Sequence, residues 1–223
     1  MGSAVKAEFG PTLPELLGSR FGVSVRTSGI VAGALVAVVL GLGVAKHEQG
    51  DGTVRATVAG AGAFNLRYDP GKLVRAAPRP GETLRLQTKP GDRSAASVAV
   101  RPVTLTPYRG DDPSVALPIF LTSVVAAMER ADPHFVELSE SPARVNSQPG
   151  YQIQYLTRID GRLWFGRRVF LFPDPREQPG ARQGADVSLL AAQSKVVANR
   201  DEVGSNGPTK IPYRSFRLGA VAP

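Results

Sequence analysis

The sequence contains no cysteine, and only two histidines and one tryptophan occur in its 223 residues. Without cysteine the chain has no disulfide bond, no thiolate metal ligand, no cysteine nucleophile and no cysteine that could carry a lipid anchor. His47 and His134 alone leave few candidates for a general base or a metal ligand. Stability therefore has to come from a hydrophobic core, which a chain of this length can form.

Sequence motifs of the common enzyme classes are also missing. No nucleophile elbow, zinc-protease helix, phosphate-binding loop or dinucleotide-binding turn occurs. His134 follows a predicted helix end, where a histidine is more often a surface or capping residue than a base. Asp111 and Asp112 precede that helix, where acidic residues favour the helix N-terminus. These absences predict a domain that is not an enzyme and has no catalytic residue, no cofactor and no metal ligand.

Positive charge is present in excess. The chain has 27 lysines and arginines against 19 acidic residues, a formal net charge of +8. Such an excess favours an anionic partner, such as lipid head groups or an acidic envelope polymer, although the same charge can serve solubility alone. The arginines are scattered along the sequence rather than clustered, so nucleic acid is not expected as a partner.

One long apolar run stands near the start of the chain. Residues 29–45 read GIVAGALVAVVLGLGVA, without a charged side chain. This length is at the short end of the ~17–25 residues that cross a bilayer as a helix. A buried core helix is the alternative, but a helix that is apolar on every side is hard to bury in so small a protein. We therefore predict a transmembrane helix, either kept as a signal anchor or removed as a cleaved signal after Ala45.

Charges beside the apolar run predict its orientation. Arg20 and Arg26 lie close before it, whereas Lys46 is followed by acidic residues. Because positive charge collects on the cytoplasmic side, the N-terminus is expected in the cytoplasm of a single-pass protein of the cytoplasmic membrane. The predicted organisation is a cytoplasmic tail over 1–28, the transmembrane helix over 29–45, a linker over 46–53, an extracytoplasmic domain over 54–218 and a C-terminal tail over 219–223.

Hydrophobic periodicity predicts an α+β fold for the domain. Apolar residues recur at helical spacing over 116–131, and Asp132-Pro133 ends this helix. Alternation of apolar and polar residues predicts four strands before the helix and four after it. These strands are expected over 54–58, 64–68, 83–87, 97–105, 135–141, 151–159, 162–172 and 185–192. The order of elements predicts an antiparallel sheet with one main helix packed on a face.

Turn residues predict how the later strands are joined. A turn is expected at 148–150, which reads Gln-Pro-Gly, and a two-residue hairpin turn at Asp160-Gly161, because this pair tolerates positive φ. With that hairpin, Tyr155 faces Gly166, and Arg168 falls on the same, aromatic side. Either this face of the sheet is partly open, or a bulge near Gly166 reverses the alternation.

Four segments of the predicted domain carry a resemblance to a known family. They are FNLRYDPGKL at 64–73, SVAVRPVTL before the helix, ARVNSQPGYQIQY at 143–155 and SFRL at 215–218. In this order, over about 53–218, the chain resembles the PsbP-like fold family, which includes the photosystem extrinsic protein PsbP and mycobacterial LpqN-type lipoproteins. Members of this family act mostly as accessory or docking domains without a shared catalytic residue set. The resemblance therefore implies a binding role and transfers no site residue.

The function predicted from these patterns is a membrane-anchored accessory or docking domain that binds another envelope protein or an anionic envelope polymer. The alternative is a small-molecule-binding or enzymatic domain with a pocket between helix and sheet. A partner surface is predicted on the hairpin 151–172, where Arg158, Arg162 and Arg167 surround Trp164. Arginine and aromatic side chains are enriched at interface hot spots. The other reading of this hairpin is a strand pair whose aromatic side chains fill the core.

Overall fold

A computed structural model describes residues 52–219, apart from 60, 61 and 93. The described residues belong to one compact unit, Gly52–Pro223. The predicted cytoplasmic tail, the transmembrane helix over 29–45 and most of the linker lie outside the described residues, so they stay predictions. Within the described part of the chain, no helix has the length and apolar character needed to span a membrane.

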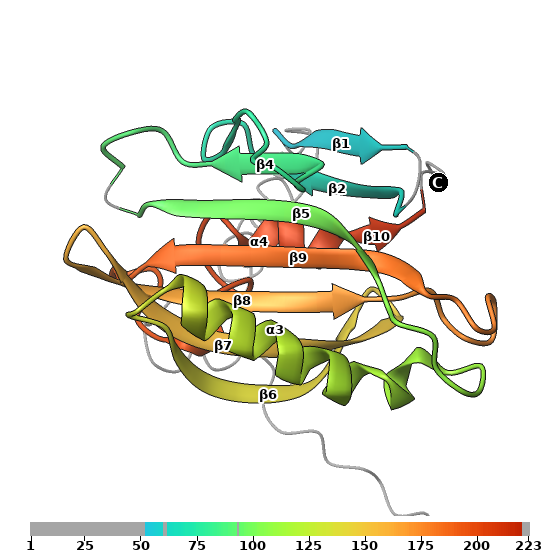
Figure 1. Cartoon of the computed structure of the whole chain (residues 1–223). Helices are drawn as coiled ribbons and strands as arrows, with labels where there is room; N and C mark the ends of the chain where they lie inside the picture. Colours follow the sequence, from blue (N-terminus) through green and yellow to red (C-terminus); the bar gives the residue numbers. More distant parts are fainter. Residues whose placement is uncertain (1–51, 60–61, 93, 220–223) are drawn as a thin grey trace, which may run out of the picture. The chain divides into compact units, whose positions relative to one another are not determined.

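A seven-stranded antiparallel sheet forms the centre of the domain (Figure 1), in the order β3-β4-β5-β9-β8-β7-β6. Alternation of more and less buried positions is clear in β4 and β6, whereas β8 and β9 are buried at most positions because both of their faces are covered. The strands are β3 (Val74–Arg75), β4 (Leu84–Gln87), β5 (Ala96–Thr104), β6 (Val136–Val145), β7 (Gln148–Ile159), β8 (Arg162–Leu171) and β9 (Gln183–Ala192).

The helix α3 (Leu117–Ala131) packs on one face of this sheet, after the 3₁₀ turn η1 (Pro113–Val115). Leu121 is fully buried against Ile153 of β7 and Phe170 of β8. The rings of Phe120 and Phe170 meet edge to face, with centroids 5.5 Å apart. Helix and sheet thus enclose a dry layer, which confirms the predicted helix on a sheet face.

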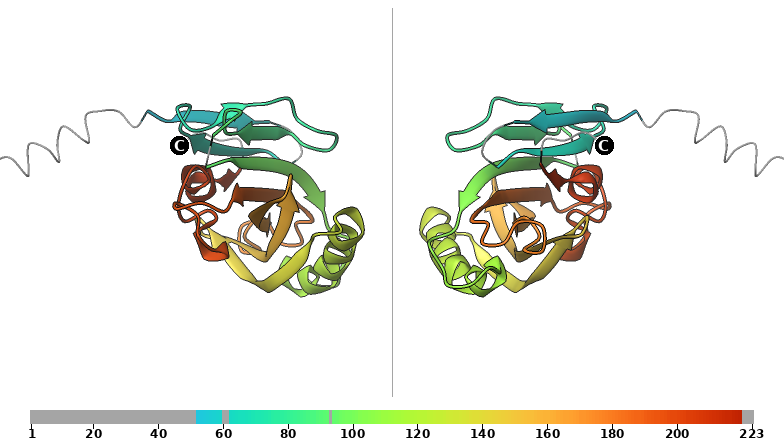
Figure 2. Two further views of the ribbon diagram at one scale, coloured as in Figure 1. Left: turned by 90° about the vertical axis from the view of Figure 1, so that its left-hand side faces the viewer. Right: turned by 90° about the vertical axis from the view of Figure 1, so that its right-hand side faces the viewer.

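The other face carries a three-stranded sheet and a short helix. The small sheet has the order β1 (Val54–Val58), β2 (Phe64–Tyr68), β10 (Arg217–Leu218), and α4 (Lys210–Ser215) lies next to it after the 3₁₀ turn η2 (Arg200–Glu202). Phe64 stacks on Phe216 with ring centroids 5.3 Å apart. Figure 2 shows α3 and α4 on opposite sides of the long sheet. The main core lies between the two sheets.

The predicted α+β class, the helix and the eight strands are confirmed, with small shifts at their ends. The sequence did not predict β3, α4 or β10, which are only two to six residues long. Pro102 in β5 lies beyond the end of β4, because β4 pairs with β5 only as far as Val100. The proline therefore leaves no ladder position without a donor.

The turn predicted at 148–150 is wrong. β7 already begins at Gln148, and the hairpin turns at Asn146 and Ser147, with φ of 46° and 70°. Asparagine accepts positive φ, so it can serve in a two-residue turn of this type. Gly150 is glycine for a different reason, because a Cβ at this position would lie 2.1 Å from the carbonyl oxygen of Phe170. The glycine permits close strand approach rather than a turn.

The turn predicted at Asp160-Gly161 is confirmed, with φ of 50° and 76°. The pairing of β7 with β8 continues without a shift, and Tyr155 faces Gly166. No bulge reverses the alternation, so Arg168 stays on the face that carries α3. Of the two alternatives, the partly open face is the one observed.

Candidate functional site

The helix α3 covers only part of its sheet face. Next to its last turn lies a cavity of about 270 Å³, floored by side chains of β4, β5, β8 and β9. Six charged residues line it, four of them arginines, and we call it the arginine hollow; they are Arg79, Glu82, Arg85, Arg101, Asp132 and Arg168. The hollow therefore forms beside the helix rather than beneath it.

The strand register explains why arginines meet here. Arg85 of β4 pairs with Ala99 of β5, which pairs with Ser188 of β9, which pairs with Arg168 of β8. One cross-strand row thus has an arginine at each end and two small residues between them. Residues that pair across strands share a face. The small residues leave the space, and the arginines form its walls.

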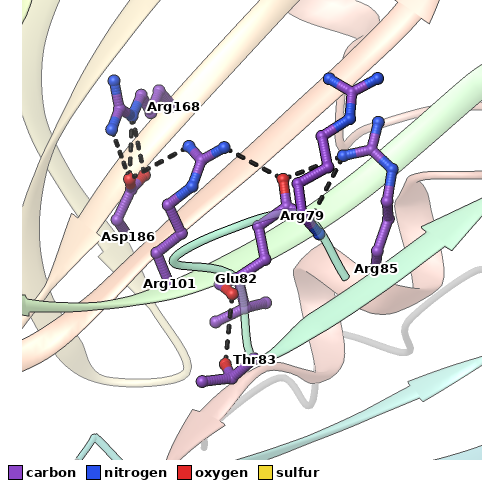
Figure 3. Close-up of polar contacts among 8 residues, drawn as sticks. Arg79, Glu82, Thr83, Arg85, Arg101, Arg168 and Asp186 are labelled. Atoms are coloured by element: carbon purple, nitrogen blue, oxygen red, sulfur yellow. Dashed lines mark hydrogen bonds and ion pairs between the residues drawn. The ribbon is translucent and has the colours of Figure 1, made fainter. Parts of the chain in front are cut away.

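Arg168 is fixed by a buried carboxylate. Its Nε donates to Asp186 Oδ1 at 2.9 Å, and its Nη2 donates to Oδ2 at 2.5 Å (Figure 3). Asp186 is only 3% exposed. Burial lowers the pKa of Arg168, but the hydrogen bond and the charge of Asp186 outweigh it and raise the pKa. The guanidinium therefore stays charged in a partly dry setting.

Glu82 is the second buried carboxylate, and it binds three arginines. It accepts from Arg85 Nη1 at 2.9 Å, from Arg101 Nη2 at 3.0 Å and from the backbone N–H of Arg79 at 3.0 Å. Burial raises the pKa of Glu82, but these hydrogen bonds and the charges of Arg85 and Arg101 together hold it below the ordinary value. Arg101 also lies 3.9 Å from Asp186, so it links the two carboxylates.

The charges are unevenly placed. Glu82 and Asp186 lie under the arginines, with side-chain exposures of 0% and 3%, whereas Asp132 at the end of α3 is half-buried and accepts a hydrogen bond from Thr157. Arg79 is exposed, and within the described residues its guanidinium makes no hydrogen bond or ion pair. Arg101 remains 35% exposed. Positive charge therefore predominates at the opening, although the buried carboxylates and Asp132 offset part of it.

A second cavity continues the hollow along the sheet. It has a volume of about 350 Å³ and shares Arg79 and Arg85 with the first. It adds Lys89 from the loop after β4 and Trp164 from β8. Together the two cavities form a groove with a basic wall and a partly apolar wall.

Tyr155 forms part of the first cavity without being a candidate base. Its ring lies over Gly166, where an added Cβ would come 2.1 Å from Cζ. Burial raises the pKa of the Tyr155 phenol, which shares a hydrogen bond with Ser188. No histidine or cysteine lines either cavity. Among the described residues, no group of three or more acidic or histidine side chains could hold a metal ion. The arrangement is suited to binding an anion.

The structure separates the four residues of the predicted partner surface. Arg158 and Arg162 are exposed, Trp164 is half-buried, and Arg167 is only 8% exposed. By strand alternation, Arg162 and Trp164 lie on the α3 face, whereas Arg158 and Arg167 lie on the opposite face. Arg167 lies over the Tyr213 ring, 5.3 Å from its centroid. The four do not form one surface, and the partner surface itself stays a prediction.

Sequence reasoning missed most of the hollow. Only Arg168 gave a signal, because the hairpin register placed an arginine on a face that was otherwise aromatic. Asp112, in contrast, acts as expected: its carboxylate caps η1 by accepting from the N–H of Ser114 at 2.8 Å. His134 lies exposed after α3, and its backbone N–H donates to Asp132.

Comparisons with known proteins give matches of structure alone. No protein-family model matches the chain, and a search of curated proteins finds no match in sequence. LpqN of Mycobacterium tuberculosis, described as involved in cell envelope biogenesis, is similar in structure, with a TM-score of 0.49 and 12% identity over 78% of this chain and 96% of that one. Cyanobacterial PsbP of Synechocystis is similar with a TM-score of 0.41 and 13% identity, over 75% and 92% of the two chains. These are the two kinds of protein that the sequence resembled.

Proposed function

We propose that this chain is a membrane-anchored binding protein whose extracytoplasmic domain, 54–218, docks an acidic partner at the arginine hollow. The observation that carries the proposal is the convergence of four arginines around one cavity, while the carboxylates of Glu82 and Asp186 lie beneath them. The partner is an envelope protein or an anionic envelope polymer. The domain acts by binding, not by catalysis.

Electrostatics supports this role. A cleft lined by one sign of charge concentrates oppositely charged groups and speeds their encounter. Arg79 and Arg101 present their charge at the opening, while Asp186 holds Arg168 in one geometry. Because carboxylates already hold Arg168 and Arg85, these two side chains need no ordering when a partner binds, which lowers the entropic cost of association.

A pocket between helix and sheet is the alternative that the packing opposes. Leu121, Phe170 and Phe172 fill that space with exposures of 1% or less. The cavity lies instead beside Met128 and Asp132, at the end of α3. A ligand would enter the same hollow that we assign to the acidic partner.

Titration with acidic polymers tests the docking proposal. Trp164 is the only tryptophan and lies in the groove, so its fluorescence reports occupancy. The full chain in detergent should bind polyphosphate or polyglutamate in a saturable, salt-sensitive manner. Replacing Arg79 and Arg85 together by Ser should remove binding, and Arg158→Ser should leave it unchanged. Equal binding by all three proteins would contradict the hollow as the docking site.

The membrane anchor is part of the proposal and rests on the apolar run 29–45 with Arg20 and Arg26 before it. A reporter that works only outside the cytoplasm should be active when fused after Pro223. Activity of a cytoplasm-only reporter at that position would contradict the orientation. A mature protein beginning near Lys46 would show a cleaved signal in place of an anchor.

A further inference from the structure

We infer that the group recognised in the groove is a phosphate ester, held between Arg79 and Arg85 with Lys89 nearby. The inference rests on the proposed function, because it names the chemistry of the group that the arginine hollow receives. Arg79 and Arg85 line both cavities, so a group bound between them lies where the two cavities adjoin.

Glu82 positions both arginines. The turn between them contains Gly81, with φ of 82°, and the backbone N–H of Glu82 donates to the carbonyl of Arg79 at 2.9 Å. The Glu82 carboxylate accepts from the Arg79 backbone on one side and from the Arg85 guanidinium on the other. One buried side chain thereby fixes the start of the turn and the arginine that follows it. Glu82 is a positioning residue and does not itself touch the ligand.

Unused donors remain on both arginines. Arg85 gives only Nη1 to Glu82, and neither its Nε nor its Nη2 has a partner among the described residues. The whole Arg79 side chain is likewise without a hydrogen bond or ion pair there. None of these nitrogens is a buried atom left unsatisfied. They are solvated donors at the wall of the groove, available to an incoming acceptor.

The number of donors favours phosphate over carboxylate. A single guanidinium satisfies the two oxygens of a carboxylate, as Arg168 does for Asp186. A phosphate ester presents more acceptor oxygens and more charge, so it can engage two guanidinium groups at once. Lys89 adds a point charge from the neighbouring loop, which is the usual role of lysine at phosphate.

Small probes separate phosphate from carboxylate. The Trp164 fluorescence of the full chain is titrated with glycerol phosphate and with glutarate, an anion of similar size and charge. We expect glycerol phosphate to bind at least about tenfold more tightly. Micelles containing phosphatidylglycerol form a third arm, because the same phosphate group can come from a lipid or from a soluble molecule. Tight binding only in that arm would assign the phosphate to a lipid.

Three variants test the assigned residues. Arg79→Lys keeps the charge but loses the planar fork, so glycerol phosphate binding should weaken by about tenfold. Glu82→Gln should weaken it as well, with no change in which probe is preferred. Arg158→Ser, on the opposite face, is the matched control and should bind as the unchanged chain does. If Glu82→Gln unfolds, Arg79→Lys still decides, because that side chain is exposed and has no partner to lose.

The outcomes distinguish the two proposals. Equal binding of glutarate and glycerol phosphate, lost in the Arg79 and Arg85 variants, would overturn phosphate recognition and leave acidic docking intact. Unchanged binding in Arg79→Lys would overturn the two-arginine clamp. If neither the small probes nor the acidic polymers bind in a way that depends on Arg79 and Arg85, both proposals are wrong.

Discussion

The covered and the open parts of one sheet face differ although they share the same strands. Under α3, β8 presents Phe170 and β7 presents Ile153, both at 1% exposure or less. One alternation away, the same β8 presents Arg168, whose guanidinium lies 5.2 Å from the centroid of the Phe170 ring. On β8, the change from the dry layer to the charged hollow therefore occurs between Phe170 and Arg168, which are neighbours on the same face.

This difference shows what the helix contributes. Apolar side chains gain stability only where another element removes them from water. The fifteen residues of α3 determine how much of the face can be apolar. Beyond the helix, arginines can occupy the inward register because their charge meets buried carboxylates and their stems cover the sheet. The open part of the face therefore uses the same strands as the covered part, but its side chains are charged instead of apolar.

Breaking the covered part should have the largest effect on stability. Leu121 is fully buried in the helix–sheet layer. Leu121→Ala should lower the free energy of unfolding by about 2–5 kcal/mol, because it removes buried methyl groups and leaves a cavity. Denaturant unfolding measures the loss. Ile119, on the same helix but 78% exposed, gives the control, and Ile119→Ala should cost less than about 0.5 kcal/mol. Similar losses in both variants would remove α3 from the core.

Breaking the Arg168–Asp186 ion pair in the open part should lower the free energy of unfolding somewhat less. Asp186→Asn leaves Arg168 without its counter-charge, and a half-removed buried ion pair costs about 3 kcal/mol. We expect a loss at the lower end of the range for buried ion pairs, because the Arg168 side chain is 19% exposed and water partly screens its charge. The double variant Arg168→Met, Asp186→Leu removes both charges and should recover much of the loss. Additive losses in a double-mutant cycle would show that the pair does not couple the two strands.

Lowering the pH should cause the smallest loss of stability, and this loss should come from the open part of the sheet face. The folded pKa of Glu82 lies below the ordinary value of 4.5, so its ionised form stabilises the fold above that pH. This contribution is lost as the pH falls through the lowered pKa. Glu82→Gln should therefore flatten the pH dependence of stability below about 4.5, measured by thermal melting across that range. Leu121→Ala should shift the whole curve without changing its slope. An unchanged slope in Glu82→Gln would contradict the role of this carboxylate.

Local patterns in the sequence were enough for much of the fold. Helical spacing located α3, and Asp160-Gly161 determined the β7–β8 register, including the facing of Tyr155 and Gly166. These features depend on residues close together in the chain. The turn at 148–150 was wrong because Pro and Gly are typical of turns, whereas Gly150 serves a close approach to Phe170.

The hollow could not be predicted in the same way. Arg85, Arg101 and Arg168 look scattered in the sequence, and they meet only because the sheet order places β4, β5, β9 and β8 side by side. That order depends on strand pairings over long sequence separations. Glu82 likewise has no local sign that marks it as buried. The cluster is a property of topology, which residue spacing does not show.

The pairing of β2 with β10 has a consequence for when the fold can form. Phe64, near the start of the domain, stacks on Phe216, and Asn65 pairs with Arg217. These contacts join residues about 150 positions apart, and closing so long a loop slows folding. A growing chain cannot bury Phe64 fully until Phe216 has emerged. The apolar side of β2 that carries Phe64 therefore stays partly exposed through most of synthesis, and a holding chaperone would bind there.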